Sequence, residues 1–452
     1  MVDTFEQQFH AAYDWVMIYQ ISLRAFTSEG TLEAAAKMLP FLSTLGFTHV
    51  QLTPVVLADD DGDRAFWSRR QMASGTQNPK NTYRIKDYFT IDEEYGTDTD
   101  LRAFVAVAHM HGLKVMLDLV YYHCAPHAVF LKEHPDFVKR SPDGTPALGP
   151  WNFPELNFDN PALEEYLWSN MVYFVEEFDI DGYRMDVGDY VPLDFWAEGI
   201  KRVRAIKPDL FMLNEGRNPA YLNVFDANYF YDGFSDSVPI AKGELPASAY
   251  QEKWLACRKM LPPGGRMLRF FDSHDIASDS YEDRHEKTLG SLGVDALLAL
   301  HFLMDGIPFL FNGYEVADDL KHNMFSNRYY GRDAAVNWAN ALTEKGAERT
   351  AFIRRLTKMR SEHESLTSGS LEWLEHDAKD SVLAFCRSGS GETLVAIVNM
   401  RGTPVTVHAD KALAIPQIML PILKKNAVAA YEGGCIRAGL LGYGYLALLV
   451  SS

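Results

Sequence analysis

The chain has 452 residues, 47% of them hydrophobic, with a formal net charge of −18 and a pI near 5.2. This acidic balance offers no basic surface for nucleic acid or an anionic membrane, so we expect neither as a partner. No stretch approaches the ~18 uninterrupted apolar residues of a membrane-spanning helix, and residues 1–16 lack the pattern of a secretory signal. The cysteines are scattered without a pattern, which suits a reducing compartment. We therefore expect a cytoplasmic protein that acts on a neutral ligand.

In chain order, apolar runs typical of buried strands alternate with segments of helical periodicity. The strand-like runs are 15–21, 48–55, 114–120, 179–187, 209–215, 226–232, 267–272 and 307–312. Residues 31–46 predict a helix, with Thr31 at its N-cap and Gly46 at its close. Residues 98–112, 160–178 and 289–306 also place apolar side chains about every 3.6 positions, as amphipathic or buried helices do.

Strand and helix alternating about eight times predict a parallel sheet, covered on both faces, that closes into a (β/α)8 TIM barrel. The residues between the third and fourth strands have no clear period and predict a short insert. After about residue 365 apolar and polar residues alternate between Gly and Ser turns, which predicts a C-terminal antiparallel β-sandwich domain. The predicted domains are a barrel of residues 1–123 and 161–364, an insert of residues 124–160, and a C-terminal domain of residues 365–452.

Four acidic residues fall at or near the ends of predicted strands: Asp118, Asp186, Glu215 and Asp275, in the third, fourth, fifth and seventh strands. Barrel chemistry gathers at the C-terminal ends of the strands, so we expect these side chains to share one cleft. Arg184 lies two positions before Asp186 and faces the same way. Its guanidinium is expected to hold Asp186 ionised. One acid at a strand end is usually a turn former or a helix cap, but a whole set at successive strand ends favours a functional site.

Glu215 follows an apolar strand, where apolar surroundings and nearby anions favour its protonated form. One carboxylate held charged and another held neutral is the pairing that glycoside hydrolysis uses. His123 and His274 follow the third and seventh strands, and neutral imidazoles there suit hydrogen bonding to sugar hydroxyls.

The residues also leave a metal-dependent chemistry open. His123, Cys124 and His127 have a spacing reminiscent of metal ligands, although no second Cys/His cluster accompanies them. The other metal-binding set that this reading would use is His123, Asp118, His274 and Asp275. A stoichiometric zinc at those residues would support this alternative; we expect no metal.

Taken together and in order, these stretches resemble the conserved regions of the α-amylase superfamily, glycoside hydrolase family 13. DLVYYH (118–123), GYRMD (182–186), LNE (213–215) and FFDSHD (270–275) are similar to its four main regions, and FPELN (153–157) to a fifth. TYRIKDYFTIDEEYGT (82–97) and IPFLFNGYE (307–315) resemble the segments after the second strand and around the eighth. The similarity covers nearly the whole barrel.

The resemblance implies a role for each matching residue. Asp186 would be the nucleophile, Glu215 the general acid/base, and Asp275 a third acid that binds sugar hydroxyls. The other implied assignments are Arg184 orienting Asp186, Asp118 as a structural partner of Arg184, His123 and His274 as sugar ligands, and Tyr83 as a stacking residue. The implied activity is retaining cleavage of α-1,4 links in an α-glucan oligosaccharide.

Departures from the family pattern qualify this expectation. Tyr122 stands where an Asn usually ligates calcium, so we expect the usual calcium site to be missing and no cofactor to be needed. Asp189 and Tyr190 stand where starch-cleaving members often carry Lys-His, which argues against cleavage of long starch chains. The sequence leaves open whether water or a sugar accepts the glycosyl group, that is, a hydrolase or an α-glucan transglycosylase or isomerase. A non-catalytic carbohydrate-binding relative is the third alternative, although such proteins typically lose one of the two acids.

Overall fold

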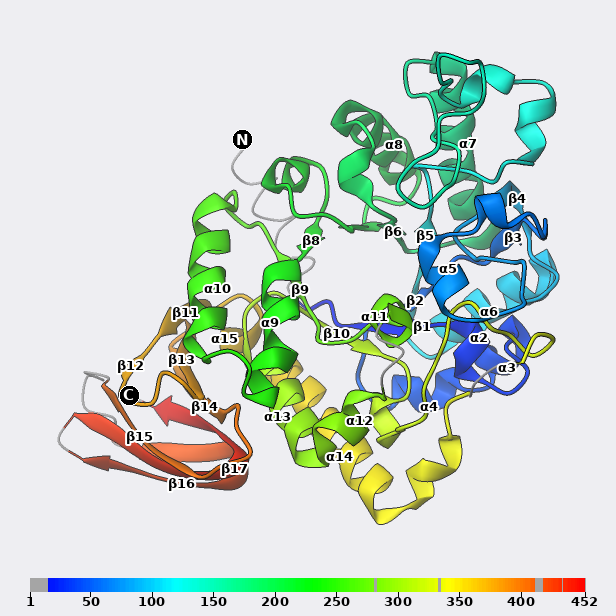
Figure 1. Cartoon of the computed structure of the whole chain (residues 1–452). Helices are drawn as coiled ribbons and strands as arrows, with labels where there is room; N and C mark the ends of the chain where they lie inside the picture. Colours follow the sequence, from blue (N-terminus) through cyan, green and yellow to red (C-terminus); the bar gives the residue numbers. More distant parts are fainter. Residues whose placement is uncertain (1–14, 280–282, 332–334, 411–417, 433, 452) are drawn as a thin grey trace.

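The computed structural model describes residues 15–279, 283–331, 335–410, 418–432 and 434–451. The stretch inspected for a secretory signal lies almost wholly outside these ranges. Within them, eight parallel strands close into a barrel, and an antiparallel sheet follows toward the C-terminus (Figure 1). This confirms the predicted (β/α)8 barrel followed by an antiparallel C-terminal β domain. In the described part of the chain no helix is both long and apolar enough to cross a membrane.

The barrel strands follow one another around the ring in chain order, and β10 closes it by pairing with β1. They are β1 (Ile18–Ile21), β2 (His49–Leu52), β5 (Lys114–Leu119), β6 (Gly182–Met185), β7 (Phe211–Asn214), β8 (Ala227–Tyr229), β9 (Met267–Arg269) and β10 (Ile307–Phe311). Nearly every residue in them is buried. Their inner faces fill the barrel and their outer faces lie under helices, which explains the nearly continuous apolar runs in the sequence.

Helices surround the barrel on its outside (Figure 1). The α-helices of the first half are α2 (Leu23–Phe26), α3 (Leu32–Ala36), α4 (Leu39–Ser43), α5 (Arg69–Ala73), α6 (Asp98–Met110), α7 (Pro161–Phe178) and α8 (Leu193–Ile206). Those of the second half are α9 (Tyr231–Lys242), α10 (Ser248–Met260), α11 (His274–Asp279), α12 (His285–Thr288), α13 (Gly290–Leu303), α14 (Glu344–Glu362) and α15 (Glu364–Thr367).

Two longer segments connect barrel strands, one after β2 and one after β5. After β2 the chain forms the hairpin β3 (Val56–Ala58) and β4 (Ile85–Ile91), with α5 between its strands. After β5, residues 124–160 form two short 3₁₀ turns and a few isolated bridges, such as that between His123 and Glu155.

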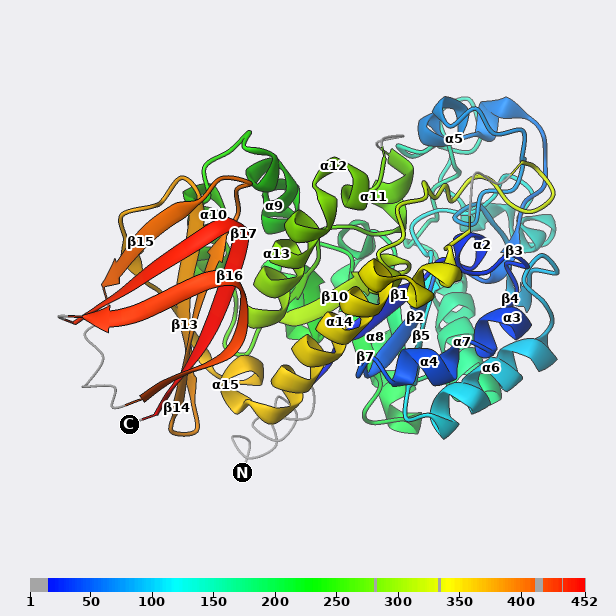
Figure 2. The same ribbon diagram turned by 90° about the horizontal axis from the view of Figure 1, so that it is seen from below.

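The C-terminal strands form one seven-stranded antiparallel sheet beside the barrel (Figure 2). They are β11 (Ser370–Trp373), β12 (Glu375–His376), β13 (Val382–Gly389), β14 (Glu392–Asn399), β15 (Val405–Asp410), β16 (Ile418–Glu432) and β17 (Cys435–Ser451). The long strand β17 joins the two halves of the sheet, because its first part pairs with β15 and its last part with β14.

Candidate active site

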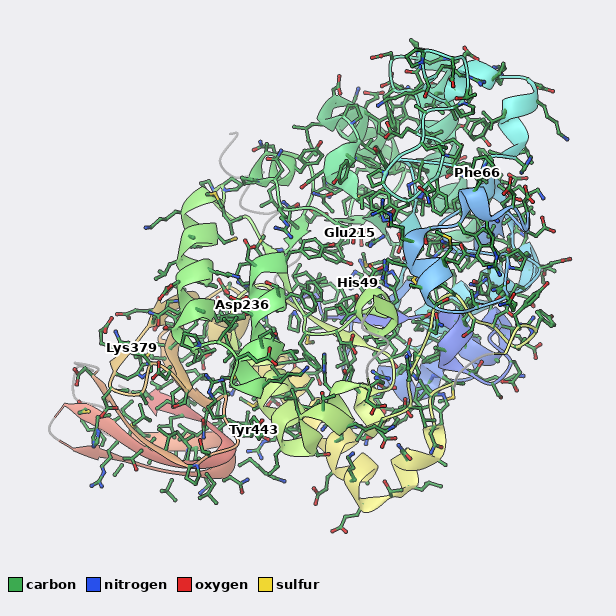
Figure 3. All side chains as sticks on the ribbon, viewed as in Figure 1. His49, Phe66, Glu215, Asp236, Lys379 and Tyr443 are labelled. Carbon is green, nitrogen blue, oxygen red and sulfur yellow. The ribbon has the colours of Figure 1, made fainter. Side chains whose placement is uncertain are left out.

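The register of neighbouring barrel strands brings two acids out at the same level. Met185 of β6 pairs with Asn214 of β7, so the residues that follow, Asp186 and Glu215, leave the barrel side by side. Backbone hydrogen bonds continue just past the strand ends: Asp186 N donates to Leu119 O at 2.9 Å, and Glu215 N donates to Met185 O at 3.1 Å. Glu215 lies over the middle of the ring of barrel elements (Figure 3). Both carboxyls therefore start from rigid backbone.

Arg184 connects three of the predicted carboxylates. The guanidinium is completely buried. Its Nη1 donates to Asp118 Oδ1 and to Asp186 Oδ1, both at 2.8 Å, and its Nη2 lies 2.8 Å from Glu215 Oε2. The period of two along a strand correctly predicts the contact with Asp186. It misses the contact with Glu215, which depends on the pairing of two strands. One cation thus fixes both candidate catalytic acids relative to each other.

Burial raises the pKa of both acids, but to different values. Burial raises the pKa of Asp186 to about 6, although Arg184 opposes the shift. Burial also raises the pKa of Glu215 to about 7, again against Arg184, and the nearby Asp186 and Asp275 add to the rise. The sequence suggested that Arg184 holds Asp186 fully ionised. The structure differs, because the loss of hydration on burial raises the pKa of Asp186 more than Arg184 lowers it. The order of the two pKa values leaves Asp186 as the more acidic member.

Glu215 accepts two further hydrogen bonds that the sequence did not indicate. The backbone N–H of Val187 donates to Oε2 at 2.7 Å, and the Tyr231 hydroxyl donates to Oε1 at 2.5 Å. Val187 has a φ of +39°, in the left-handed region. A β-branched residue there costs roughly 1–3 kcal/mol and marks functional strain more often than chance. The strained turn after Asp186 thus aims an N–H at its neighbouring acid.

Asp189 ties the loop after Asp186 to the loop after Glu215. Its Oδ2 accepts hydrogen bonds from the backbone N–H groups of Arg217 (2.6 Å) and Asn218 (2.9 Å), and its Oδ1 accepts one from Asn214 Nδ2 at 3.0 Å. A Cβ at Gly216 would lie 2.1 Å from Asp189 Oδ1, so only glycine permits this close approach. This carboxylate is therefore engaged in holding the backbone next to Glu215.

The third predicted acid, Asp275, lies in the first turn of α11 among three cationic or aromatic neighbours. Arg70 Nη1 donates to Asp275 Oδ1 at 2.8 Å, and His274 Nε2 lies 3.4 Å from Oδ2. Burial alone would raise the pKa of Asp275, but His274, Arg70 and Arg184 hold it well below its usual range. Asp275 is thus a permanent anion, whereas Asp186 and Glu215 titrate near neutrality.

Tyr83 and the two histidines complete the wall around these acids. The Tyr83 hydroxyl donates to Asp118 Oδ2 at 2.9 Å and lies 2.5 Å from His274 Nε2, and its ring stacks on His274 with an interplanar angle of 11°. Burial lowers the pKa of His123 and of His274 to about 4, so both are neutral at physiological pH. Among the described residues the buried His123 Nδ1 has no hydrogen-bond partner.

A cavity of about 260 Å³ lies above the barrel and joins the predicted residues. Five of the eight predicted site residues line this cavity: Tyr83, His123, Asp186, Glu215 and Asp275. The other three, Arg184, Asp118 and His274, are not among the lining residues and contact those that are, as described above. Further lining residues are Arg70, Trp151, Phe153, Tyr231 and Phe325. Tyr231 begins α9, two residues after β8 and near the end of the sixth predicted strand run, so its position at a strand end could have marked it as a candidate. Arg70 lies in a polar excursion whose sequence carries no such signal.

His123 and His127 of the first alternative metal set contact different residues. His127 Nδ1 contacts Asp59 and Asp61 at 3.3 and 3.2 Å, away from His123, whose Nε2 lies 2.9 Å from the Tyr83 carbonyl oxygen. Within the described ranges no group of three or more His, Cys, Asp or Glu has the arrangement of a metal site. Tyr122 uses its hydroxyl to donate to Glu155 Oε1 at 2.7 Å. The residue in the Asn position therefore does not present the amide oxygen that the family's calcium takes.

The fold and site are those of a (β/α)8-barrel protein with a carboxylate cluster at the C-terminal ends of its strands. A family model described as the catalytic domain of α-amylase matches residues 6–143. A cyclomaltodextrinase of a Bacillus species is 26% identical over 397 residues, which are 82% of this chain and 65% of the relative. An intracellular maltogenic amylase of Bacillus subtilis is 25% identical over 398 residues, covering 82% of this chain and 62% of the relative.

A noncanonic maltogenic α-amylase of Thermotoga neapolitana has the same fold, with a TM-score of 0.82 at 24% identity over 97% of this chain and 99% of that chain. The chain spans slightly less than two thirds of the length of the two curated relatives. These matches agree with the resemblance to the α-amylase superfamily that the order of the motifs predicted.

Proposed function

We propose that this protein is a retaining α-glycoside hydrolase that acts on α-1,4-linked maltooligosaccharides through a covalent glycosyl-enzyme. The observation that carries this proposal is the placement of Asp186 and Glu215 on one guanidinium, at the wall of one cavity. Retaining glycosidases need such a pair within ~5–5.5 Å of each other, one anionic and one protonated. The pKa order of the two acids supplies that difference in protonation.

The first half of the reaction forms the covalent intermediate. Glu215 protonates the glycosidic oxygen while Asp186 attacks the anomeric carbon from the other face of the ring. Positive charge develops on the ring in the transition state, and the anionic Asp186 and Asp275 stabilise it in a buried site where electrostatic interactions are strong. The neutral imidazole of His123 binds a ring hydroxyl, and Tyr83 packs against the sugar.

The second half releases the sugar and restores the enzyme. Glu215, now a base, removes a proton from the incoming hydroxyl, which attacks the anomeric carbon and displaces Asp186. Two inversions return the α configuration. Water as acceptor gives hydrolysis, and a sugar hydroxyl as acceptor gives transglycosylation on the same residues. The names of the relatives, cyclomaltodextrinase and maltogenic amylase, support an α-glucan substrate and hydrolysis. An intracellular relative supports a cytoplasmic location.

A panel of α-glucosides, followed by chromatography and proton NMR of the products, tests the proposal. We expect cleavage of α-1,4-linked maltooligosaccharides, with the α anomer formed first and little transfer to added glucose. Asp186→Asn should lower kcat by roughly 10⁴-fold or more, because it removes the nucleophile's charge and keeps its shape. Asp159→Asn, an exposed acid of the insert, serves as the control. An initial β anomer, or an Asp186→Asn variant with near-normal rates, contradicts the assignment.

We further propose that activity does not depend on calcium at the family's usual site. The hydroxyl of Tyr122 is directed at Glu155 and offers no amide oxygen to the ion. Activity and the melting temperature should therefore be unchanged after exhaustive treatment with a chelator. Loss of either one, restored by added calcium, would show that other residues bind the ion.

A further inference from the structure

Arg70 occupies an unexpected place beside the candidate acids. It belongs to α5, in the segment between β3 and β4, and contacts Asp275 at the start of α11, after β9. Its Nη1 donates to Asp275 Oδ1 at 2.8 Å, and its Nη2 donates to the Asp275 backbone oxygen at 2.7 Å. Both side chains are 29% exposed and both line the cavity. The pair therefore forms part of the cavity wall.

The chemistry of the proposed reaction tells which end of the cavity this wall closes. Glu215 protonates the oxygen of the leaving group, so the leaving part of the substrate lies toward Glu215. The resemblance to the α-amylase superfamily assigns Asp275 to hydroxyls of the sugar ring that stays on the enzyme. A guanidinium held on Asp275 is within reach of those same hydroxyls. Arg70 thus lies at the end of the cavity that receives the retained sugar.

The segment that carries Arg70 is fixed to the barrel rather than free. Ser68 caps α5 by accepting a hydrogen bond from Gln71 N at 3.1 Å, and Gln71 Nε2 donates to the Asn78 carbonyl oxygen at 3.0 Å. Asn78 Nδ2 and Thr76 Oγ1 each donate to the Phe325 carbonyl oxygen at 3.1 Å, in the chain that follows β10. Phe325 itself lines the cavity. The wall is therefore built from two barrel loops bonded to each other.

The cavity is small. At about 260 Å³ it is just below the range of roughly 300–1,000 Å³ typical of small-molecule pockets. A cation next to a ring that becomes positively charged also opposes the reaction, unless it is neutralised or used for binding. Asp275 neutralises Arg70 here, and the guanidinium keeps the geometry to donate to neutral hydroxyls.

We propose that Arg70 is a specificity-determining residue that closes the cavity beyond Asp275, so that the site accepts only the non-reducing end of an α-glucan and releases short products. Arg70 donates to hydroxyls of the terminal sugar, and its side chain leaves no room for further sugar units beyond it. This inference rests on the proposed function and adds the end of the glucan chain from which the enzyme cleaves.

The test compares maltoheptaose with a maltoheptaoside whose non-reducing end is blocked by a 4,6-O-ethylidene group, for wild type and Arg70→Ala. We expect wild-type kcat/KM to be at least 100-fold lower on the blocked substrate. Arg70→Ala should narrow this ratio at least tenfold and give longer products, because internal segments can then enter. Arg69→Ala removes the same charge from an exposed neighbour in the same helix and should leave the ratio unchanged.

Each other outcome has a defined meaning. A wild-type enzyme that cleaves both substrates equally overturns the inference and leaves the proposed function standing, whereas failure to cleave maltoheptaose overturns the function itself. An Arg70→Ala variant that loses kcat on both substrates with the ratio and products unchanged also overturns it, because Arg70 would then only position Asp275. If Arg70→Ala does not fold, Arg70→Met keeps the aliphatic stem and carries the same expectation.

Discussion

Among single residues, Asp186 and Glu215 share a buried setting and one cation, and the nearby Asp186 and Asp275 further raise the pKa of Glu215. Arg184 touches both, and burial raises the pKa of both. Glu215 additionally meets the Val187 N–H and the Tyr231 hydroxyl, which favour its charged form. Its pKa nevertheless stays above that of Asp186. A proton shared between these acids therefore resides mainly on Glu215, as an acid catalyst requires.

This difference predicts a narrow bell-shaped pH dependence of kcat/KM. Asp186 must lose its proton, so activity should rise with pH through about 6. Glu215 must keep its proton, so activity should fall as pH rises through about 7. The limbs report the pair in the free enzyme. Rates of a soluble maltooligosaccharide between pH 4 and 9, at constant ionic strength, measure both limbs.

Tyr231→Phe gives the sharper check of the assignment to Glu215. Removing the hydroxyl takes away a hydrogen bond that favours the charged carboxylate, so the pKa of Glu215 rises. The alkaline limb should move up by about half a unit to one unit, as expected for a hydrogen bond worth about 1 kcal/mol. The acid limb should stay in place. Tyr190→Phe, in an exposed side chain, is the control; a shift of the acid limb instead would assign the proton to Asp186.

Some residues of the site could be predicted from the sequence, and others could not. Motif order and strand parity place Asp186, Glu215 and Arg184 correctly, because both depend on local spacing. Tyr231, only 16 positions from Glu215, was missed although it lies near a predicted strand end, whereas Arg70 was missed because its contact joins segments far apart in the chain. Arg70 and Asp275, for example, are separated by 205 positions. No local pattern encodes such a pair.

At the level of elements, the barrel strands were predicted best, and the connecting helices and the insert were predicted less well. All eight predicted runs contain the barrel strands, because two buried faces demand continuous apolar sequence. The predicted helix 31–46 is instead two short helices, α3 and α4. Pro40 stands at the start of α4, where its missing N–H is tolerated, whereas one continuous helix would place it in the interior. The insert has no periodicity, and its turns and isolated bridges could not be placed beforehand.

Asp189 links the loop after β6 to the loop after β7, and the role of this link can be tested. Asp189→Ala removes the acceptor of two backbone N–H groups next to Glu215, at Arg217 and Asn218. The freed loop should misplace Glu215, and we expect kcat to fall roughly 10- to 100-fold with KM little changed. Steady-state kinetics measure this split.

Asp189→Asn is the matched comparison, since its amide oxygen can still accept from the same two N–H groups. It should recover most of the activity that Asp189→Ala loses. Equal losses in the two variants would show that the negative charge or the hydrogen bond from Asn214 Nδ2 matters, rather than the hydrogen bonds to the loop. A rise in KM without a fall in kcat would place Asp189 in acceptor binding, as the family's Lys at this position suggests.

At the level of the whole molecule, the barrel and the antiparallel sheet share one core. Alternate residues of β13 face opposite ways: Leu383 and Phe385 pack into the core of the barrel, while Ala384 packs into a second core within the sheet. Tyr443, between the sheet and the barrel helices (Figure 3), donates to the Ala241 carbonyl oxygen at 3.0 Å. The sheet also exchanges backbone hydrogen bonds with the barrel, such as Ala247 N to Asp380 O at 3.0 Å.

A shared core predicts that the two parts unfold together. Phe385 is completely buried, and its ring centroid lies 5.5 Å from that of Trp373. Phe385→Ala should lower the free energy of unfolding by about 3–5 kcal/mol, through lost burial and the cavity left behind. Because the same core supports the barrel, thermal inactivation and the loss of circular dichroism should move down together, as one transition. Val428→Ala, at a residue of the sheet that is 68% exposed, should change stability by no more than about 0.5 kcal/mol. If instead Phe385→Ala produced an early transition of the sheet alone, with activity lost only at the original temperature, the sheet would be an independent folding unit.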